Sequence, residues 1–327
     1  MRQIVLSNPG EFVKRDVSVP TFSPGEGLVR IRKVGVCGSD FHAFTGSHPI
    51  YTYPRVLGHE LAGEVVEVGA NDFDIRIGDR CAIEPYISCG QCKPCQAGRT
   101  NCCEKLRVIG IHVDGGMQEF LPVPLSLLHK SEKLSLEELA LVETLGIGAH
   151  AVSRSKIGQG QSALVVGAGP IGLAVAEFAR AAGADVCIVE KSQWRRDFAT
   201  RLGMKAVAES GGLLSDVVFD ATGSAASMSQ SLSYVAPGGS LVFVGLTKEP
   251  VTLNDSLLHT REMTIYSSRN SCGQFRRIIR MLEESQIKTV PWITDRMALA
   301  QVPSEFKDLP RRPTLIKAIV DVEEARS

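Results

Sequence analysis

The chain has 327 residues, enough for about two domains that each bury a core. Lys and Arg together number 36, as do Asp and Glu, so no basic excess favours nucleic acid or an anionic membrane as a partner. The N-terminus lacks a charged segment followed by a long apolar one, which predicts a cytoplasmic protein. The longest uncharged stretch, 162–176, is broken by Gly and Pro and is too short to span a membrane, so we expect a small-molecule substrate.

The first third of the chain contains short β-like runs at 27–32, 64–68 and 79–83. Apolar and polar residues alternate in these runs, and Gly or Pro separates them. This pattern predicts a small antiparallel barrel or sandwich.

Two motifs in this region carry potential metal ligands. Cys37 opens the run Cys-Gly-Ser-Asp-Phe-His, and His59 and Glu60 follow Gly58. A catalytic zinc needs about three N, S or O ligands and one position open to substrate, and a Cys, a His and a carboxylate can supply them. Each of these residues alone is also compatible with an ordinary structural role.

Four further cysteines follow with the spacing C-x2-C-x2-C-x7-C, at Cys89, Cys92, Cys95 and Cys103. In a cytoplasmic chain thiols stay reduced, so clustered cysteines favour metal binding over disulfides. Four thiolates leave no open position for substrate, which predicts a structural zinc site. A zinc-ribbon binding module is the alternative, but the neutral charge and the long remainder of the chain argue against it.

From about residue 163 buried strands alternate with helices. The strands are expected at 163–166, 184–190, 216–219 and 240–244, with a crossover helix at 170–182. This order predicts a parallel, doubly wound sheet. An amphipathic helix at 274–285 and a strand at 315–322 follow.

The first crossover carries a glycine-rich turn that fits G-x-G-x-x-G. Because the turn lies between a strand and a helix, it predicts a dinucleotide site with the pyrophosphate at the helix N-terminus. The residues assigned to this turn are Gly167, Gly169, Pro170, Ile171 and Gly172.

Glu190 ends the next strand, 18 positions after Gly172, where a carboxylate binds the adenosine ribose. Its charge would repel the 2′-phosphate of NADP, so the sequence favours NAD. Lys191, Arg195 and Arg196 form an alternative phosphate site if Glu190 turns away, but we expect Arg195 to lie over the adenosine.

The order of these motifs, together with Val-Glu-Thr-Leu at 142–145, resembles the zinc-dependent medium-chain dehydrogenases nearly from end to end. That family includes alcohol, sorbitol and threonine dehydrogenases. The resemblance implies an α/β protein in which a Rossmann domain, 145–267, is inserted into a GroES-like β-rich catalytic domain, 1–144 and 268–327. It also implies an active site in the cleft between the domains and a homodimer or homotetramer.

The resemblance also assigns roles to individual residues. Glu143 stands where alcohol dehydrogenases proper carry a second catalytic Cys, which is typical of the polyol and threonine branch. Zinc in such a site acts as a Lewis acid on the substrate hydroxyl and is shared, directly or through water, by Cys37, His59, Glu60 and Glu143.

In the same family pattern, Ser39 hydrogen-bonds the substrate oxygen and passes its proton through the cofactor ribose to His42. The alternative is that Ser39 and His42 only stabilise a turn. Further cofactor contacts are assigned to Gly245, Leu246 and Ser268.

Arg269 is the one candidate substrate residue. A guanidinium beside the nicotinamide could hold a carboxylate bidentately, and this stretch together with 291–294 is similar to dehydrogenases of L-galactonate and L-gulonate. Arg269 could equally pair with a cofactor phosphate or a nearby acidic side chain.

The leading prediction is therefore a zinc-dependent oxidoreductase that transfers a hydride from a secondary hydroxyl of a polyol or sugar acid to NAD. A hydroxy amino acid dehydrogenase and a non-catalytic zinc- and dinucleotide-binding protein of the same fold are the alternatives. A zinc-free quinone reductase would have no use for both metal motifs.

Overall fold

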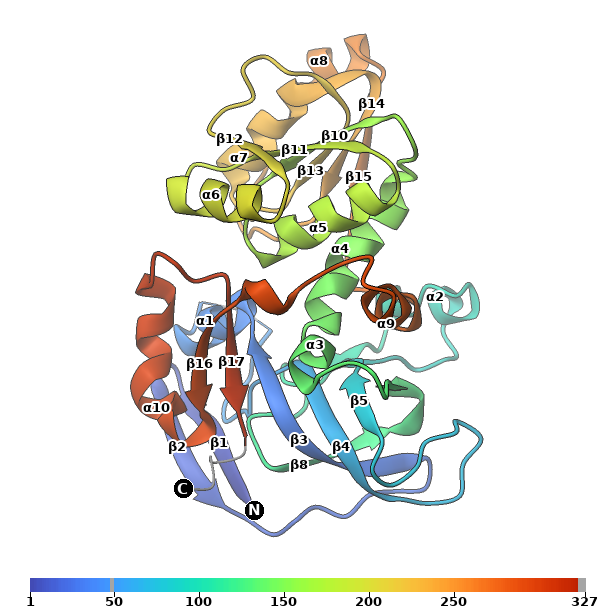
Figure 1. The fold of residues 1–327 in the computed structure, drawn as a ribbon, viewed down its shortest axis with the longest axis vertical. Helices are drawn as coiled ribbons and strands as arrows, with labels where there is room; N and C mark the ends of the chain where they lie inside the picture. Colours follow the sequence, from blue (N-terminus) through green and yellow to red (C-terminus); the bar gives the residue numbers. More distant parts are fainter. Residues whose placement is uncertain (48–49, 323–327) are drawn as a thin grey trace. The chain divides into compact units, whose positions relative to one another are not determined.

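The computed structural model describes residues 1–47 and 50–322 and divides into two compact units (Figure 1). One unit comprises Met1–Glu143 and Phe275–Ser327, and the other comprises Thr144–Gln274. The sequence predicts an inserted domain over 145–267 and a return to the first domain over 268–327. Residues 323–327 of that last segment lie outside the described residues. The second unit extends past residue 267 because the chain stays bonded to its sheet there: the Ser268 N–H donates to the Phe243 carbonyl at 2.9 Å.

The first unit is built on a seven-stranded sheet in the order β16-β17-β3-β4-β5-β9, with β8 paired to β3. The pairs are antiparallel except for β16 and β17, which run parallel. The strands are β3 (Glu26–Val36), β4 (Glu60–Val68), β5 (Arg80–Ile83), β8 (Phe120–Pro124), β9 (Leu128–Lys130), β16 (Ile293–Ala298) and β17 (Lys317–Asp321).

Shorter elements complete this unit. Two hairpin-like pairs are β1 (Arg2–Asn8) with β2 (Glu11–Asp16), and β6 (Tyr86–Ile87) with β7 (Arg107–Val108). Its helices are α1 (Gly38–Phe44), α2 (Lys93–Gln96), α3 (Leu136–Ala140), α9 (Phe275–Glu283) and α10 (Val302–Glu305), and its short 3-10 helices are Thr100–Cys102, Leu125–Leu127, Val290–Trp292, Leu299–Gln301 and Phe306–Arg311.

The alternating pattern in the first third has a direct structural cause. In β3 the side chains of Val29 and Ile31 are fully buried in the core, whereas Arg30 between them is exposed. Successive side chains of a strand point to opposite faces, so one face of the sheet packs inward and the other meets water. The predicted antiparallel β-rich domain is therefore confirmed.

The second unit contains a six-stranded parallel sheet in the order β12-β11-β10-β13-β14-β15. This is the predicted doubly wound architecture. Its strands are β10 (Ser162–Val166), β11 (Asp185–Val189), β12 (Lys205–Val207), β13 (Ser215–Asp220), β14 (Val235–Phe243) and β15 (Thr264–Ser267). Its helices are α5 (Pro170–Ala181), α6 (Gln193–Arg201), α7 (Ala225–Ser231) and α8 (Asp255–Thr260), the 3-10 helix Leu232–Tyr234, and α4 (Val142–Ser155), which begins in the first unit.

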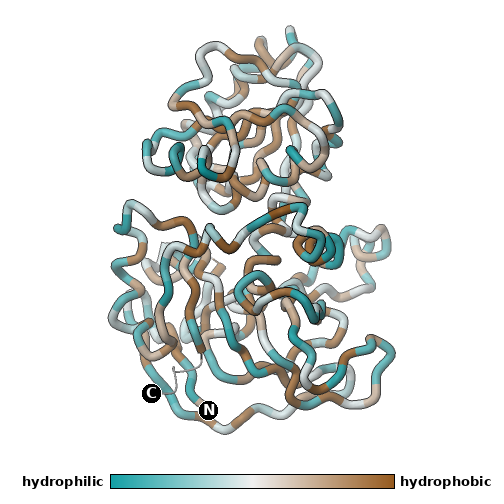
Figure 2. Tube along the Cα trace, in the orientation of Figure 1, coloured by the Kyte–Doolittle hydropathy of each residue, from teal (hydrophilic) through white to brown (hydrophobic). Residues whose placement is uncertain are grey.

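Each unit buries its own apolar residues, and Figure 2 shows hydrophobic residues concentrated along the strands of the parallel sheet. The chain's two tryptophans are divided between the units. Trp292 is fully buried in the first unit, whereas Trp194 lies on α6 of the second and stacks on Phe198 with 5.4 Å between ring centroids. None of the helices within residues 1–47 and 50–322 is both long and apolar enough to span a membrane.

Candidate functional site

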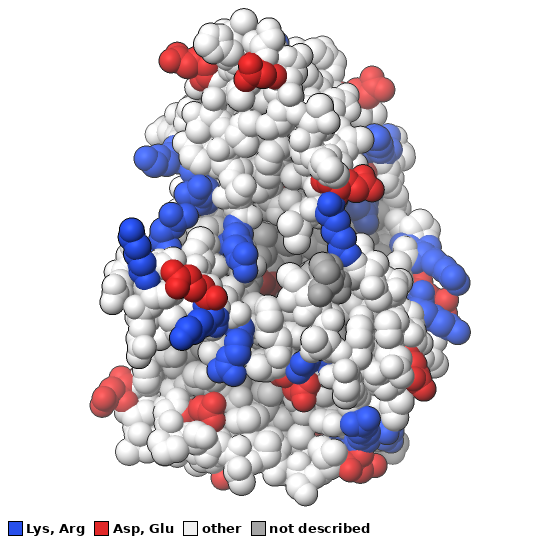
Figure 3. Space-filling view, turned by 180° about the vertical axis from the view of Figure 1, so that it is seen from behind, with Lys and Arg blue, Asp and Glu red and all other residues white. Residues whose placement is uncertain are grey.

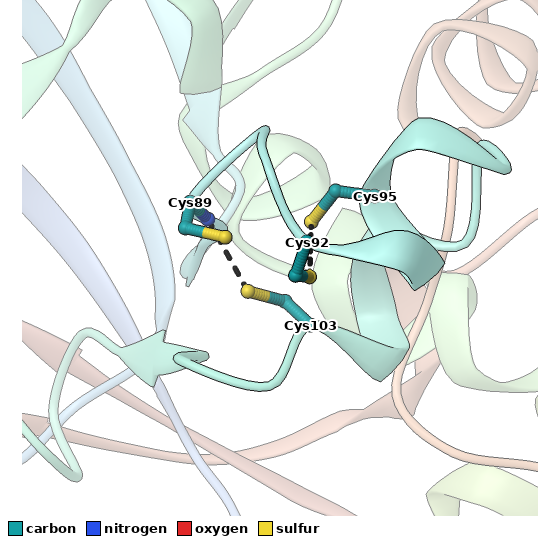
Figure 4. A group of neighbouring side chains, drawn as sticks. All are labelled: Cys89, Cys92, Cys95 and Cys103. Atoms are coloured by element: carbon teal, nitrogen blue, oxygen red, sulfur yellow. Dashed lines mark hydrogen bonds between the residues drawn. The ribbon is translucent and has the colours of Figure 1, made fainter.

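The four clustered cysteines meet in the loop between β6 and β7. The Sγ atoms of Cys89, Cys92, Cys95 and Cys103 all lie within 4.8 Å of one another, and Figure 4 shows them pointing toward a common centre. Backbone N–H groups of Cys89 and Lys105 donate to the Cys103 sulfur at 3.2 and 3.3 Å. Four converging thiols with amide donors around them fit a closed tetrahedral zinc site.

A second group of metal-type ligands lies at the start of α1 and β4. Cys37 precedes α1, and His59 and Glu60 open β4; their ligand atoms also lie within 4.8 Å of one another. Glu143, at the start of α4, is not one of these three, although its carboxylate is close enough for His59 and Glu60 to influence its pKa. The structure thus brings all four predicted ligands into one neighbourhood and gathers three of them most closely.

Asp40 supports the imidazole of His59 from behind. Its carboxylate is fully buried, accepts the Cys37 N–H at 2.9 Å and lies 3.6 Å from His59 Nδ1. Burial raises the pKa of Asp40, and the neighbouring His59 opposes that rise. A carboxylate beside the far ring nitrogen orients a metal-binding histidine so that Nε2 faces the metal.

Glu60 is paired with Lys317 of β17, whose Nζ lies 2.6 and 2.7 Å from its two carboxylate oxygens. The exposed fractions are 1% for Glu60 and 2% for Lys317, so the pair is shielded from water. Gly35 of β3 makes room for it, because a Cβ at this position would lie 2.1 Å from Glu60 Oε2.

Glu143 has a different partner. The hydroxyl of Tyr86, in β6, donates a hydrogen bond to Glu143 Oε1. Both side chains are buried, and burial raises the pKa of the Tyr86 phenol and of the Glu143 carboxyl.

Ser39 and His42 lie one turn apart on α1. Ser39 Oγ is 3.5 Å from His59 Nε2, which places the hydroxyl at the metal-facing side of the imidazole. His42 is exposed, and its Nδ1 lies 3.2 Å from Ser47 Oγ. The helix therefore carries a hydroxyl at the site and an imidazole at the surface on neighbouring positions.

In the second unit the glycine turn follows β10 and opens α5. Gly167 has φ +100°, and a Cβ on Gly172 would lie 1.8 Å from the Gly167 carbonyl oxygen. Only glycine fits both positions, so the backbone can turn tightly and leave the α5 N-terminus open to a phosphate. Pro170 and Ile171 are the first two residues of that helix, and Gly169 is its N-cap.

Glu190 follows β11 and is fixed by two backbone N–H groups. Its carboxylate accepts from Ala168 and from Ser192, each at 2.8 Å. With Gly167 and Thr222 it lines a pocket of about 750 Å³ that also includes Lys191. Lys191, one of the residues of the alternative phosphate site, follows Glu190 beyond the end of β11 at Val189 and therefore also lines this pocket.

The remaining predicted cofactor residues surround the carboxyl ends of β14 and β15. The Gly245 N–H donates to the Asp220 carbonyl at 2.9 Å, Leu246 is 79% exposed, and Ser268 directly follows β15. Arg269 is exposed in the segment after β15.

The patterns in the sequence do not single out Asp40, Tyr86 or Lys317 as residues of the site. Asp40 lies within the quoted Cys-Gly-Ser-Asp motif, so its position between Cys37 and His42 could have drawn attention to it. Tyr86 and Lys317 stand far along the chain from their carboxylate partners, and no spacing connects them.

Figure 3 shows one face of the molecule, on which Lys and Arg are interspersed with Asp, Glu and uncharged surface. This mixed face agrees with the balanced composition of the chain.

Comparison with known proteins matches both halves of the chain to family models. Residues 23–133 match the alcohol dehydrogenase GroES-like domain, and residues 170–284 match the zinc-binding dehydrogenase domain. The L-galactonate-5-dehydrogenase of Escherichia coli K12 is 38% identical over 98% of each chain.

Solved structures extend the similarity to the whole fold. A zinc-binding dehydrogenase of Sinorhizobium meliloti 1021, bound to NADP, superposes with a TM-score of 0.92 at 31% identity over 98% of each chain. A protein of E. coli CFT073 named short chain alcohol dehydrogenase (rspB), in complex with NADH, gives a TM-score of 0.93 at 27% identity over 98% of this chain and 99% of its own.

Proposed function

Because the chain belongs to the zinc-containing medium-chain alcohol dehydrogenase family, as a zinc-dependent, NAD(P)-linked enzyme of the polyol and sugar-acid type, we propose that it oxidises a secondary hydroxyl of a sugar acid with NAD. The observation that carries the proposal is the convergence of Cys37, His59 and Glu60 beside Ser39 in one unit, with a dinucleotide-type turn in the other.

The donor set fits a catalytic zinc. It combines a thiol, an imidazole and carboxylates, and the imidazole already has a carboxylate, Asp40, beside its far nitrogen. When bound, zinc supplies a Lewis acid that lowers the pKa of a substrate hydroxyl. Cys37 and His59 would hold it, with Glu60 and Glu143 close by.

The chain's own residues handle the proton. Ser39 lies where a hydroxyl can accept a hydrogen bond from the substrate, since its Oγ is 3.5 Å from His59 Nε2. His42, one helical turn further and exposed, can release the proton to water as a general base. The ribose of the cofactor would bridge the two.

The choice of NAD rests on Glu190. Two backbone amides hold its carboxylate in the pocket, where its negative charge would repel a 2′-phosphate. Arg196, one of the alternative phosphate ligands, instead donates to the carbonyls of Glu190 and Lys191 at 2.6 and 2.7 Å. Arg195 Nη1 would lie 3.8 Å from a Cβ on Gly169, so it is placed beside the glycine turn.

Arg269 supports an acidic substrate. We propose that its guanidinium holds the carboxylate of a sugar acid, of the kind named for the 38% identical relative. The test is a panel of L- and D-aldonates, neutral polyols and hydroxy amino acids, each offered with NAD and NADP and followed by nicotinamide absorbance.

An aldonate that is oxidised with NAD at the highest kcat/KM supports the proposal, and exclusive use of a neutral polyol or a hydroxy amino acid overturns the substrate class. Arg269→Ala should raise KM for the aldonate by roughly 10-fold or more while changing a neutral substrate little. An equal effect on both would remove the substrate role of Arg269. Cys37→Ser should abolish turnover and leave cofactor binding intact.

A further inference from the structure

We propose that Tyr86 is a positioning residue: its hydroxyl holds the Glu143 carboxylate beside the catalytic zinc site and keeps it out of the coordination position that substrate needs. The inference rests on the proposed function only in assuming that substrate uses that position. Tyr86 is outside both predicted ligand groups.

The two side chains form a buried, hydrogen-bonded pair. Tyr86 is 6% exposed and Glu143 is 5% exposed, and the Tyr86 hydroxyl donates to Glu143 Oε1. A hydrogen bond to a carboxylate is stronger where water is excluded, and a buried carboxylate that loses its donor must find another partner. A metal ion held by Cys37 and His59 would offer such a partner, since the Glu143 carboxylate is close enough to interact electrostatically with His59.

The backbone fixes Tyr86 in place. It lies in β6 opposite Val108 of β7, and the Ile109 N–H donates to the Pro85 carbonyl at 2.9 Å. The loop with the four converging thiols begins and ends at this two-stranded ribbon. A zinc ion in that loop would therefore also brace the strand that carries the Tyr86 hydroxyl.

The other carboxylate of the site is held in a different way. Glu60 is paired through both oxygens with a cationic ammonium, Lys317, which neutralises its charge. Glu143 instead has the neutral Tyr86 hydroxyl as its hydrogen-bond donor, and its carboxylate could bind zinc if it were released. A single phenol hydroxyl thus restrains Glu143, whereas an ammonium ion in direct contact holds Glu60.

The test compares wild type, Tyr86→Phe, Glu143→Gln and the double variant Tyr86→Phe/Glu143→Gln. Tyr53→Phe is the matched control, because it removes a phenol that donates to a backbone carbonyl, that of Ala43, in the same unit. For each protein, zinc affinity is measured by competition with a chromophoric chelator. The visible spectrum is recorded after Co²⁺ replaces the catalytic metal.

Tyr86→Phe should bind zinc more tightly by roughly 10-fold, the factor for one lost hydrogen bond, and shift the Co²⁺ bands as a carboxylate enters the ligand set. Its activity should fall. With Glu143→Gln as background, adding Tyr86→Phe should change neither the affinity nor the spectrum, and Tyr53→Phe should match wild type.

Wild-type zinc affinity and an unchanged spectrum in Tyr86→Phe would overturn the proposal, as would weaker zinc binding. The proposal would also be overturned if Tyr86→Phe changed the zinc affinity and the Co²⁺ spectrum equally in the wild type and in Glu143→Gln. Such an effect would not depend on the Glu143 carboxylate. All these readings are made without substrate. Failure of the proposed sugar-acid activity would appear separately, as an inactive wild type with the predicted metal behaviour.

Discussion

The ammonium of Lys317 contacts both carboxylate oxygens of Glu60, and strand β3 lies between the strands that carry them. Glu60 is one of the three residues gathered as potential zinc ligands, so the cation lies at the edge of the metal site. When one partner of a buried ion pair is removed, the other charge is left without compensation.

Lys317→Met should therefore lower the free energy of unfolding of the metal-free protein by about 3–5 kcal/mol, measured by urea denaturation. The loss should be smaller in the zinc-loaded protein, because the metal ion can compensate the Glu60 charge. Lys33→Met is the control, since Lys33 pairs with Asp321 where both side chains are a quarter or more exposed. The control should cost about 0–1 kcal/mol, and an equal loss in both variants would contradict the role assigned to burial.

Cys92→Ser should reduce the zinc content from two ions per chain to one and lower the melting temperature, because a closed metal site contributes directly to folding. Atomic absorption and thermal melting measure the two effects. Cys102→Ser is the matched control: Cys102 adjoins Cys103 but does not belong to the group of four. A Cys92→Ser protein with wild-type stability that has lost only activity would reverse the division between structural and catalytic metal.

Wild-type enzyme should prefer NAD over NADP by roughly 5- to 1000-fold, the range given by repulsion between Glu190 and a 2′-phosphate. Glu190→Ser should lose most of this preference, as seen in kcat/KM with each cofactor. Glu209→Ser, a change at an exposed residue of the same pocket, should alter the preference much less. A wild type that prefers NADP would transfer the phosphate-binding role to Lys191 and Arg195.

Asp216 provides a pH-dependent prediction away from the metal sites. The backbone N–H and the hydroxyl of Ser162, both at 2.7 Å, hold the pKa of Asp216 below its usual value. A lowered folded-state pKa stabilises the protein above the unfolded value of about 3.9, and this stabilisation is lost as pH falls through the folded value. Asp216→Asn should therefore melt at a lower temperature than wild type at pH 7, and the difference should shrink below about pH 4. A constant difference at all pH values would argue against the ionised carboxylate as its source.

Much of the fold follows from local patterns. The predicted crossover helix 170–182 is α5 (Pro170–Ala181), and the predicted strand 216–219 lies within β13 (Ser215–Asp220). Apolar runs bounded by Gly and Pro determine these elements within a few residues. The four-cysteine loop is equally local, because its ligands span only 89–103.

Long-range partners could not be found in this way. Glu60 and Lys317 are 257 residues apart, and Tyr86 and Glu143 are 57 apart. A lysine at the start of a strand normally predicts a solvent-exposed position, and only the buried carboxylate opposite explains its burial. The sequence thus indicated which residues could bind a metal, but the donors that orient their carboxylates depend on strand pairing.

Because the two tryptophans lie in different units, each can serve as a fluorescence reporter for its own unit. In Trp194→Phe, emission would come from Trp292 alone, which is fully buried in the unit that holds both thiol-containing metal sites. In Trp292→Phe it would come from Trp194, on the helix that follows Glu190. Quenching by added dinucleotide and the red shift on removal of metal could then be assigned to different units, so that each unit's unfolding is followed by its own optical signal.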